Sequence, residues 1–430
     1  MILRATCTTA AVATALALAA HAADWPQFRG PDRSAISKET GLLRKWPEGG
    51  PRLVWKAANL GEGHSTPSVA GGRVFGMGLR GENEVVWALD EKTGKELWST
   101  RIAGAIVLGG PQGGYGPRST PTVDGSRLFA LGVGGELVCL ETQTGRLEWS
   151  KSLVKDFGGS VPTWGYSESP LVDGDKVIAT PGGANTIVAF NKATGAVIWT
   201  AKIQEGSRVA YSSCIPAVVG GRRQYVQFLA GGVVGVDART GELLWRYDRP
   251  ANRQGINCSM PLVQDDLVFA ASAYGNGGGL AKVSPQGAGF QAQEVYFTRQ
   301  MQNHHGGMVL LGGHLYGFDN SSLTCLEWKT GTVKWTDRSV GKGSLVAADG
   351  LLIARSERGS VALIEANPEK YVELGRFDQP DRSSAPSWPY PVVANGRLYL
   401  RDQDILLCYD ATAGSAAGEG RGSSARAATQ

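Results

Sequence analysis

ALDEKTGKELW, residues 88–98, decides the fold of this protein because close copies of it return along the chain. The copies are CLETQTGRLEW (139–149), AFNKATGAVIW (189–199), GVDARTGELLW (235–245) and CLEWKTGTVKW (325–335). Their glycines, which are 51, 50, 46 and 90 residues apart, are Gly94, Gly145, Gly195, Gly241 and Gly331. Because 90 is two periods of about 45 residues, the pattern predicts a weaker copy near 281–284, and another follows at 362–365.

A second element precedes each copy and has the form Pro-x-Val-x-x-Gly followed by apolar residues. Six clear examples begin at Pro67, Pro121, Pro170, Pro216, Pro261 and Pro391, and weaker ones begin at Gly307 and Ser344. These eight starts are about 46 residues apart, which is enough chain for four short strands and three tight turns. That unit is the blade of a β-propeller, so the repeat predicts an all-β, eight-bladed propeller of four-stranded antiparallel blades.

The motif residues have structural explanations. Glycine takes the positive φ that a tight hairpin requires, and the preceding Asp, Asn or Glu can accept hydrogen bonds from the turn. The tryptophan follows on the outer strand, where it can pack between neighbouring blades and bury on the order of 200 Å². We therefore expect structural roles for the five motif glycines and for Trp55, Trp98, Trp149, Trp199, Trp245 and Trp335.

The two ends of the chain are predicted to close the ring. The last blade, beginning at Pro391, contains only three strand-like segments before residue 410. The missing outer strand is available upstream at 52–56, where Trp55 matches the repeated tryptophan. Pairing these segments would leave no open edge. The propeller is thus expected to occupy residues 23–410, and the Gly/Ala/Ser-rich residues 411–430 are expected to be a disordered tail.

The first 22 residues resemble a secretory signal peptide. Arg4 precedes an apolar run at 10–20, and Ala20-His21-Ala22 fits a cleavage site. No later run is long enough to span a bilayer, and no cysteine lies at the cleavage site to carry a lipid. We expect a periplasmic or secreted protein without a transmembrane segment, and a monomer. The net charge of +4 includes no long basic run, so nucleic acid is not an expected partner.

The repeat resembles the tryptophan-docking repeat of quinoprotein dehydrogenases, and the blade count resembles the PQQ-like β-propeller repeat proteins. That family includes the outer-membrane assembly factor BamB. The start of the mature chain, DWPQFRGP at 24–31, is similar to the start of many exported bacterial members. The resemblance covers residues 24–410 and implies the fold strongly. It implies function only weakly, because the repeated residues are structural.

Candidate site residues lie in the segments just before each inner strand, because those segments should surround one mouth of the central channel. They offer groups that can bind a ligand: His64, Arg118, Tyr166, Glu168, Ser213, Asn257, Asn303, His304, Lys342 and Trp388. The same groups could instead line a water-filled mouth and satisfy one another. His304 and His305 are adjacent, so on a strand they would point to opposite faces, and no metal site is expected.

Two functions remain open. The first is an exported binding or scaffold module for a protein, peptide or glycan partner in the cell envelope, as the BamB-like resemblance implies. The second is a dehydrogenase that uses pyrroloquinoline quinone (PQQ) and Ca²⁺. The quinoprotein resemblance would then assign Glu168, Asn257 and Asn303 to Ca²⁺, Arg118 or Lys342 to the quinone carboxylates, and Trp164 or Trp388 to its rings. The chain lacks an adjacent cysteine pair and a C-x-x-C-H haem site, so no cofactor is assigned.

Overall fold

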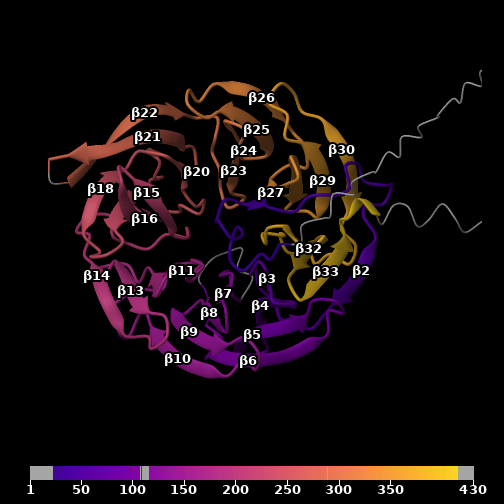
Figure 1. The fold of residues 1–430 in the computed structure, drawn as a ribbon, viewed down its shortest axis with the longest axis horizontal. Helices are drawn as coiled ribbons and strands as arrows, with labels where there is room; N and C mark the ends of the chain where they lie inside the picture. The colour runs from indigo at the N-terminus through magenta and orange to yellow at the C-terminus, as the bar shows by residue number, and fades with distance from the viewer. Residues whose placement is uncertain (1–22, 107, 109–115, 288, 415–430) are drawn as a thin grey trace, which may run out of the picture.

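The computed structural model describes residues 23–106, 108, 116–287 and 289–414. Within these residues the protein is all-β, and eight sheets stand around a central axis like the blades of a propeller (Figure 1). The predicted fold class is confirmed. The expected signal peptide, residues 1–22, and tail residues 415–430 lie outside the described residues.

Each blade is an antiparallel sheet whose strands follow one another outward from the axis. Blades one to four contain β3(Ser68–Ala70), β4(Arg73–Arg80), β5(Asn83–Asp90), β6(Glu96–Gly104), β7(Thr122–Asp124), β8(Arg127–Leu131), β9(Glu136–Glu141), β10(Leu147–Ser152), β11(Leu171–Asp173), β12(Lys176–Ala179), β13(Ile187–Asn191), β14(Val197–Ala201), β15(Ile215–Val219), β16(Arg222–Leu229), β17(Gly232–Asp237) and β18(Leu243–Tyr247). Blades five to eight contain β19(Leu262–Gln264), β20(Leu267–Ser272), β21(Gly277–Gln286), β22(Gly289–Thr298), β23(Met308–Leu311), β24(His314–Asp319), β25(Ser322–Glu327), β26(Val333–Asp337), β27(Gly343–Ala348), β28(Leu351–Ser356), β29(Ser360–Glu365), β30(Glu373–Asp378), β31(Val392–Ala394), β32(Arg397–Asp402) and β33(Ile405–Asp410).

The ring closes as the sequence predicts. The outer strand of blade eight is β2(Leu53–Ala57), which pairs antiparallel with β33 and places Trp55 opposite Cys408. One strand was not expected: β1(Ile36–Ser37) pairs parallel with the inner strand β27 and makes blade seven five-stranded. Both additions come from the N-terminal part of the chain, so this part ties blades seven and eight together.

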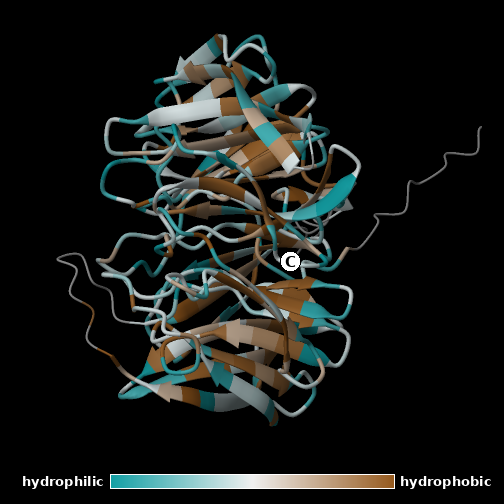
Figure 2. Ribbon diagram, turned by 90° about the vertical axis from the view of Figure 1, so that its left-hand side faces the viewer, coloured by the Kyte–Doolittle hydropathy of each residue, from teal (hydrophilic) through white to brown (hydrophobic). Residues whose placement is uncertain are grey.

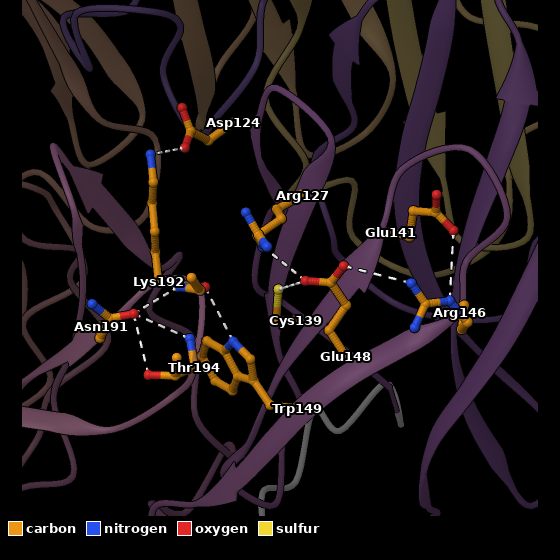
Figure 3. Close-up of polar contacts among 11 residues, drawn as sticks. Asp124, Arg127, Cys139, Glu141, Arg146, Glu148, Trp149, Asn191, Lys192 and Thr194 are labelled. Carbon is orange, nitrogen blue, oxygen red and sulfur yellow. Dashed lines mark hydrogen bonds and ion pairs between the residues drawn. The ribbon is translucent and has the colours of Figure 1, made fainter.

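Neighbouring blades are joined through the motif tryptophans, as Figure 3 illustrates for blades two and three. Trp149 on β10 donates its indole N–H to the carbonyl oxygen of Lys192 (3.1 Å) in the turn after β13. Asn191 shapes this turn by accepting hydrogen bonds from the Thr194 N–H (3.1 Å) and hydroxyl (3.2 Å). Gly195 has a φ of +70°, and a Cβ there would lie 2.9 Å from the Trp149 ring. Glycine is therefore required twice over, by the turn and by the ring.

The same joint recurs at four other blade boundaries. In each case an indole N–H donates to a turn carbonyl of the following blade: Trp55 to Glu91 (2.9 Å), Trp98 to Thr142 (3.0 Å), Trp199 to Ala238 (3.2 Å) and Trp335 to Asn367 (2.8 Å). The joint links only adjacent blades, so the ring is held by a chain of equivalent neighbour contacts.

The blades that lack a complete motif use substitutes. In blade five the aromatic ring against Gly331 is that of Tyr296, whose hydroxyl donates to the Trp328 carbonyl (3.0 Å). In blade seven the position equivalent to the tryptophan is Gly375, and Trp46 of the N-terminal segment packs over it. The repeat pattern did not predict either aromatic residue, because neither lies at the motif spacing.

The N-terminal segment also crosses the centre of the ring, where it appears in indigo in Figure 1. Trp25 pairs with Val69 of β3 through two hydrogen bonds of 2.8 Å, and the N–H of Val123 in β7 donates to the Pro26 carbonyl (2.7 Å). Further along, the Ser37 hydroxyl donates to the carbonyl of Val393 in β31 (2.9 Å). The segment thus binds to inner strands on both sides of the axis.

Two buried arginines complete this crossing. Arg33 donates to the carbonyls of Ser169 (3.0 Å), Pro170 (2.7 Å) and Cys214, just before the inner strands of blades three and four. Arg29 donates to the Met308 carbonyl in blade six. Burial lowers the pKa of Arg33 to about 10, so it remains a cation at neutral pH. Through these hydrogen bonds the two arginines fix residues 24–37 across the axis.

The far end of the chain adds a smaller correction. Residues 411–413, expected to begin a disordered tail, are ordered against the N-terminal segment. The Leu43 N–H donates to the Ala411 carbonyl (2.8 Å), and Leu42 forms a bridge with Thr412. The two ends of the described chain therefore meet beside blade eight.

Hydropathy follows the architecture. Figure 2 turns the ring on edge and shows hydrophobic strands through the body, with hydrophilic residues gathered at the turns on both faces. The interior consists of apolar clusters between adjacent blades, such as the one that contains Trp199, Tyr225 and Val234. Across the described residues, no helix has the length and apolarity needed to cross a membrane.

The joint between blades three and four provides a stability test. Trp199 is buried, contacts Gly241 and stacks with Tyr225 at a centroid distance of 6.0 Å. Trp199→Ala should lower the free energy of unfolding by about 3–5 kcal/mol. Trp199→Phe should cost less, because it retains an aromatic ring and loses mainly a hydrogen bond worth about 1 kcal/mol. Urea denaturation followed by circular dichroism measures both, and a cost under about 1 kcal/mol for the alanine variant would contradict the packing role.

A second stability test concerns a carboxyl group buried between blades one and two. Glu84 on β5 accepts the Val133 N–H (3.1 Å) from the β8–β9 turn. Burial raises its pKa to about 8, opposed by the Val133 hydrogen bond and assisted by the nearby Glu136. The folded state therefore holds a proton that the unfolded chain releases near pH 4.5. This contribution to stability is complete at low pH and is lost as the pH rises toward 8.

The matched variant is Glu84→Gln, which stays neutral at every pH. The stability advantage of the variant over the wild type should grow between pH 5 and pH 8.5, measured by urea denaturation across that range. A stability difference that does not change with pH would exclude a shifted titration at Glu84.

Candidate axial cavity

A cavity of ≈ 140 Å³ lies where the segments preceding the inner strands converge. Seven of the eight blades contribute to it, which places it on the axis of the ring. This volume is below the range of about 300–1,000 Å³ that is typical of pockets for drug-sized ligands, so the space suits one side chain better than a large cofactor. Six aromatic side chains dominate the lining: Phe28, Trp164, Tyr211, Tyr274, Trp388 and Tyr390. We call this space the axial cavity.

One position in the repeat accounts for most of the lining. It is the third residue before the start of the inner-strand element, and in blade order it is occupied by His64, Arg118, Ser167, Ser213, Cys258, His304 and Trp388. Four of the residues directly before or after this position turn into the blades instead, namely Tyr166, Glu168, Asn257 and Asn303, whereas His305 also lines the cavity. Alternation in an extended chain explains this, because successive side chains point to opposite sides.

The crossing N-terminal residues 24–37 form the floor of the axial cavity. Phe28 lines the cavity and packs edge-on against Tyr390 at a centroid distance of 5.2 Å. The Tyr390 hydroxyl donates to the His305 carbonyl (2.6 Å), and its N–H donates to the Thr66 hydroxyl (3.0 Å). The cavity is consequently blocked by the N-terminal segment on one side and bounded by the blade-connecting loops on the other.

Three histidines surround Trp388. The ring centroids of His64 and His305 lie 4.4 and 5.0 Å from the Trp388 ring, and His304 lies 4.5 Å from His305. Burial lowers the pKa of His304 to about 3 and holds the pKa of His64 well below its usual value, assisted by neighbouring cationic groups. All three imidazoles are therefore neutral at pH 7, and His304 Nε2 lies 3.0 Å from the Tyr274 hydroxyl.

The carboxylate of Glu357 lies next to these histidines. Glu357 Oε1 lies 2.7 Å from His305 Nε2 and 3.2 Å from Lys342 Nζ. Burial opposes ionisation of Glu357, but His305 and Lys342 outweigh it and bring its pKa down to about 2. Glu357 therefore stays ionised and is neutralised by Lys342. By contrast, His305 Nδ1, His64 Nε2 and Trp388 Nε1 are buried without a hydrogen-bond partner among the described residues.

Arg118 supplies positive charge to the wall. Its Nε donates to the Trp164 carbonyl (2.8 Å), and its guanidinium carbon lies 5.3 Å from the centre of the Trp388 ring. Burial lowers its pKa to about 10, so it remains charged at neutral pH. In the described lining of the axial cavity, Arg118 is the one side chain with a full charge at pH 7. This wall therefore favours an anionic or aromatic ligand over a cation.

The residues expected at the channel mouth separate into two groups. His64, Arg118, Ser213, His304 and Trp388 line the axial cavity. Lys342 lies behind it, against Glu357. The remaining four are buried in the blades: Tyr166, Glu168, Asn257 and Asn303.

These four side chains make internal hydrogen bonds. Tyr166 donates to the Pro181 carbonyl (2.9 Å), and Glu168 accepts from the Thr180 N–H (2.8 Å) and hydroxyl (3.0 Å). Burial raises the pKa of Glu168 to about 7. Their roles in this structure are to hold turns within the ring.

The expected Ca²⁺ ligands do not form a cage. The Asn257 amide donates to the Leu229 carbonyl (2.8 Å), while the Asn303 amide oxygen accepts the Ser259 hydroxyl (2.5 Å). Glu168 is likewise occupied, by Thr180 and by Gln227 of the neighbouring blade, and none of the three lines the axial cavity. Calcium requires several oxygen ligands directed at one point. These three side chains therefore do not fit a Ca²⁺-bound quinone.

The structure also brings in residues that the repeat did not indicate. His304 and His305 were expected on opposite faces, but both line the axial cavity, because residues 301–307 precede β23 and are not a strand. Tyr274 and Glu357 come from turns between the second and third strands of their blades. These turns vary in sequence, so their approach to the axis becomes visible only after folding.

Sequence comparisons point to one family. The family profile described as "Outer membrane protein assembly factor BamB" matches residues 26–112 and 82–337. BamB of Yersinia pestis is 22% identical over 378 residues, which cover 82% of this chain and 86% of that protein. Tetrathionate hydrolase of Acidithiobacillus ferrooxidans is 24% identical over 229 residues, and the match covers 51% of this chain and 43% of that enzyme.

Solved structures agree on the fold. BamB of Moraxella catarrhalis has a TM-score of 0.58 and 16% identity, with 83% of this chain and 97% of that chain covered. Quinohemoprotein alcohol dehydrogenase of Comamonas testosteroni has a TM-score of 0.61 and 12% identity, with 95% and 82% covered. At these identities the structural likeness establishes the fold alone. Since the profile matches well over half of the chain, this protein belongs to the PQQ-like β-propeller family of outer membrane protein assembly factor BamB.

Proposed function

We propose that this chain is an exported, non-catalytic propeller that binds a protein or peptide partner in the cell envelope. The axial cavity is the anchoring point, and it receives a side chain of the partner. The surrounding loops form the rest of the contact surface. The signal-like residues 1–22 support the proposed export, and the family relationship to an outer membrane protein assembly factor supports a protein partner.

The observation that carries this proposal is the aromatic lining of a cavity blocked at its base. Trp164, Trp388 and Tyr211 present large apolar surfaces together with N–H and O–H groups. Trp, Tyr and Arg are the residues most enriched among those that dominate binding energy at protein interfaces. A pocket of this composition gains affinity by burying one large side chain and excluding water around it.

The polar groups argue against a dehydrogenase centre. Such a centre, as the quinoprotein resemblance implies it, needs a free carboxylate base close to the reacting carbon and an oxygen cage for Ca²⁺. Here Glu357 is neutralised by Lys342, and Glu168 is bonded to Thr180 and to Gln227 of the next blade. The likeness to quinohemoprotein alcohol dehydrogenase is a likeness of fold at 12% identity. The geometry therefore favours binding over catalysis.

The experiment begins with random linear dodecapeptides selected by mRNA display on the purified full chain. Selected peptides are synthesised and titrated by calorimetry against the wild type, Trp388→Ala and Val218→Ala. Val218 is an exposed apolar residue on β15, outside the axial cavity, and serves as the matched control. We expect Trp388→Ala to weaken binding at least about tenfold, in keeping with the loss of an aromatic anchor, and Val218→Ala to leave it unchanged.

Three results would overturn the proposal. Equal affinities for wild type and Trp388→Ala, with both proteins folded by circular dichroism, would remove the axial cavity from binding. Binding of a soluble oligosaccharide that depends on Trp388, with no peptide selected, would replace the peptide by a glycan. Saturable uptake of PQQ with Ca²⁺, followed by dye reduction with alcohols or sugars, would establish an enzyme.

A further inference from the structure

A second hollow adjoins the axial cavity over blades three and four. It is lined by residues 158 and 160–164, which follow blade two, and by 181–183, 208, 209, 211, 230 and 254–256 among the described parts of the chain. Trp164, Tyr211 and Ile256 line both spaces. The hollow is therefore a groove that reaches the axial cavity across a shared ridge of two aromatic residues and an isoleucine. We call it the side groove.

The walls of the side groove combine side chains with stretches of bare main chain. Glycines at 158, 182, 183 and 255 leave the backbone uncovered. At Gly182 the φ is +80°, and a Cβ would lie 2.8 Å from the Val209 nitrogen, so no larger residue fits. The glycine N–H groups are already used, since Gly183 donates to the Ser207 carbonyl (3.1 Å) and Gly255 to the Asn252 carbonyl (3.0 Å). Recognition in this groove therefore depends on shape and on side chains.

The charged side chains in the described linings of the axial cavity and the side groove are both positive. Arg208 is the one ionised side chain in the described lining of the side groove, as Arg118 is in that of the axial cavity. Neither described lining contains an Asp or a Glu. Arg208 is exposed and makes no side-chain hydrogen bond or ion pair with the described residues. An incoming anion would thus meet a guanidinium group that needs no rearrangement.

We propose that the side groove and the axial cavity together bind an extended acidic peptide segment. An aromatic side chain of the segment fills the axial cavity against Trp164, Tyr211 and Trp388. A carboxylate of the same segment pairs with Arg208 in the side groove. This inference rests on the proposed function and adds to it the chemistry of the partner and the direction in which it lies across the ring.

Three features favour this occupant over others. The groove continues the cavity along one direction, which suits a chain better than a compact ligand. The shared ridge is aromatic, so it can pack against an aromatic side chain edge to face. The charges require a negative group, and a carboxylate matches the planar fork of an arginine.

The test uses the selected peptides and changes the charge both on the peptide and on the protein. Each peptide is made in three forms, with its acidic residue kept, changed to the amide, or changed to lysine. They are titrated against the wild type, Arg208→Glu and Arg239→Gln. Arg239 is an exposed arginine in the turn between β17 and β18, outside both linings, and serves as the control.

We expect the selected peptides to combine an aromatic residue with an acidic one. Arg208→Glu should lower the affinity for the acidic form roughly tenfold, and this variant should bind the lysine form more tightly than the wild type does. Arg239→Gln should change neither affinity. Raising the salt concentration should weaken the acidic form more than the amide form. Recovery of binding by the lysine form cannot arise from unfolding, so it identifies the contact.

The outcomes separate the two proposals. If Trp388→Ala removes binding while Arg208→Glu leaves the acidic form unchanged, the axial cavity is a binding site and the inference about the side groove is wrong. Selected peptides without acidic residues would also overturn it. If neither variant affects binding, both proposals fail.

Discussion

The contact between an indole ring and the hairpin glycine of the next blade is the interaction on which this ring depends. At Trp149 and Gly195 the turn conformation and the ring both exclude a Cβ, and the indole N–H satisfies a turn carbonyl at the same time. Because each joint links only neighbours, the array would end in two open edges if the chain were a simple repeat. Pairing of β2 with β33 removes both edges, and Trp55 then provides the joint from the last blade to the first.

The N-terminal segment has several structural roles besides closure. It supplies Trp46 where blade seven has Gly375, and it adds β1 to that blade. Where it crosses the axis, Arg29 and Arg33 bind it to main-chain carbonyls of the blades. Buried guanidinium groups satisfied by main-chain carbonyls fix this crossing strongly, because leaving either charge unpaired in the interior would be costly. The crossing turns an open channel into a cavity with Phe28 at its base. The axial cavity is therefore a consequence of how residues 24–37 cross the ring.

The candidate site was partly predictable from the repeat. Residues three positions before the start of each inner-strand element, including His64, Arg118 and Trp388, reach the axial cavity. Their neighbours Glu168 and Asn257 turn into the blades and hold turns there. Whether a side chain points to the cavity or into a blade depends on its place in the alternation of side chains along an extended stretch. That stretch is not part of a sheet. No hydrophobic pattern marks that phase, because both sides are buried and both contain polar groups.

The sequence by itself determined the number of blades, their strand order and the pairing that closes the ring. These features follow from local chemistry that repeats every 46 residues or so: a glycine turn, an apolar inner strand and an outer aromatic residue. Only the tertiary structure decided that Tyr296 and Trp46 replace missing tryptophans, that residues 24–37 block the axis, and that a groove opens beside the cavity. Such features arise from contacts between segments far apart in the chain, for which turn chemistry and periodicity carry no signal.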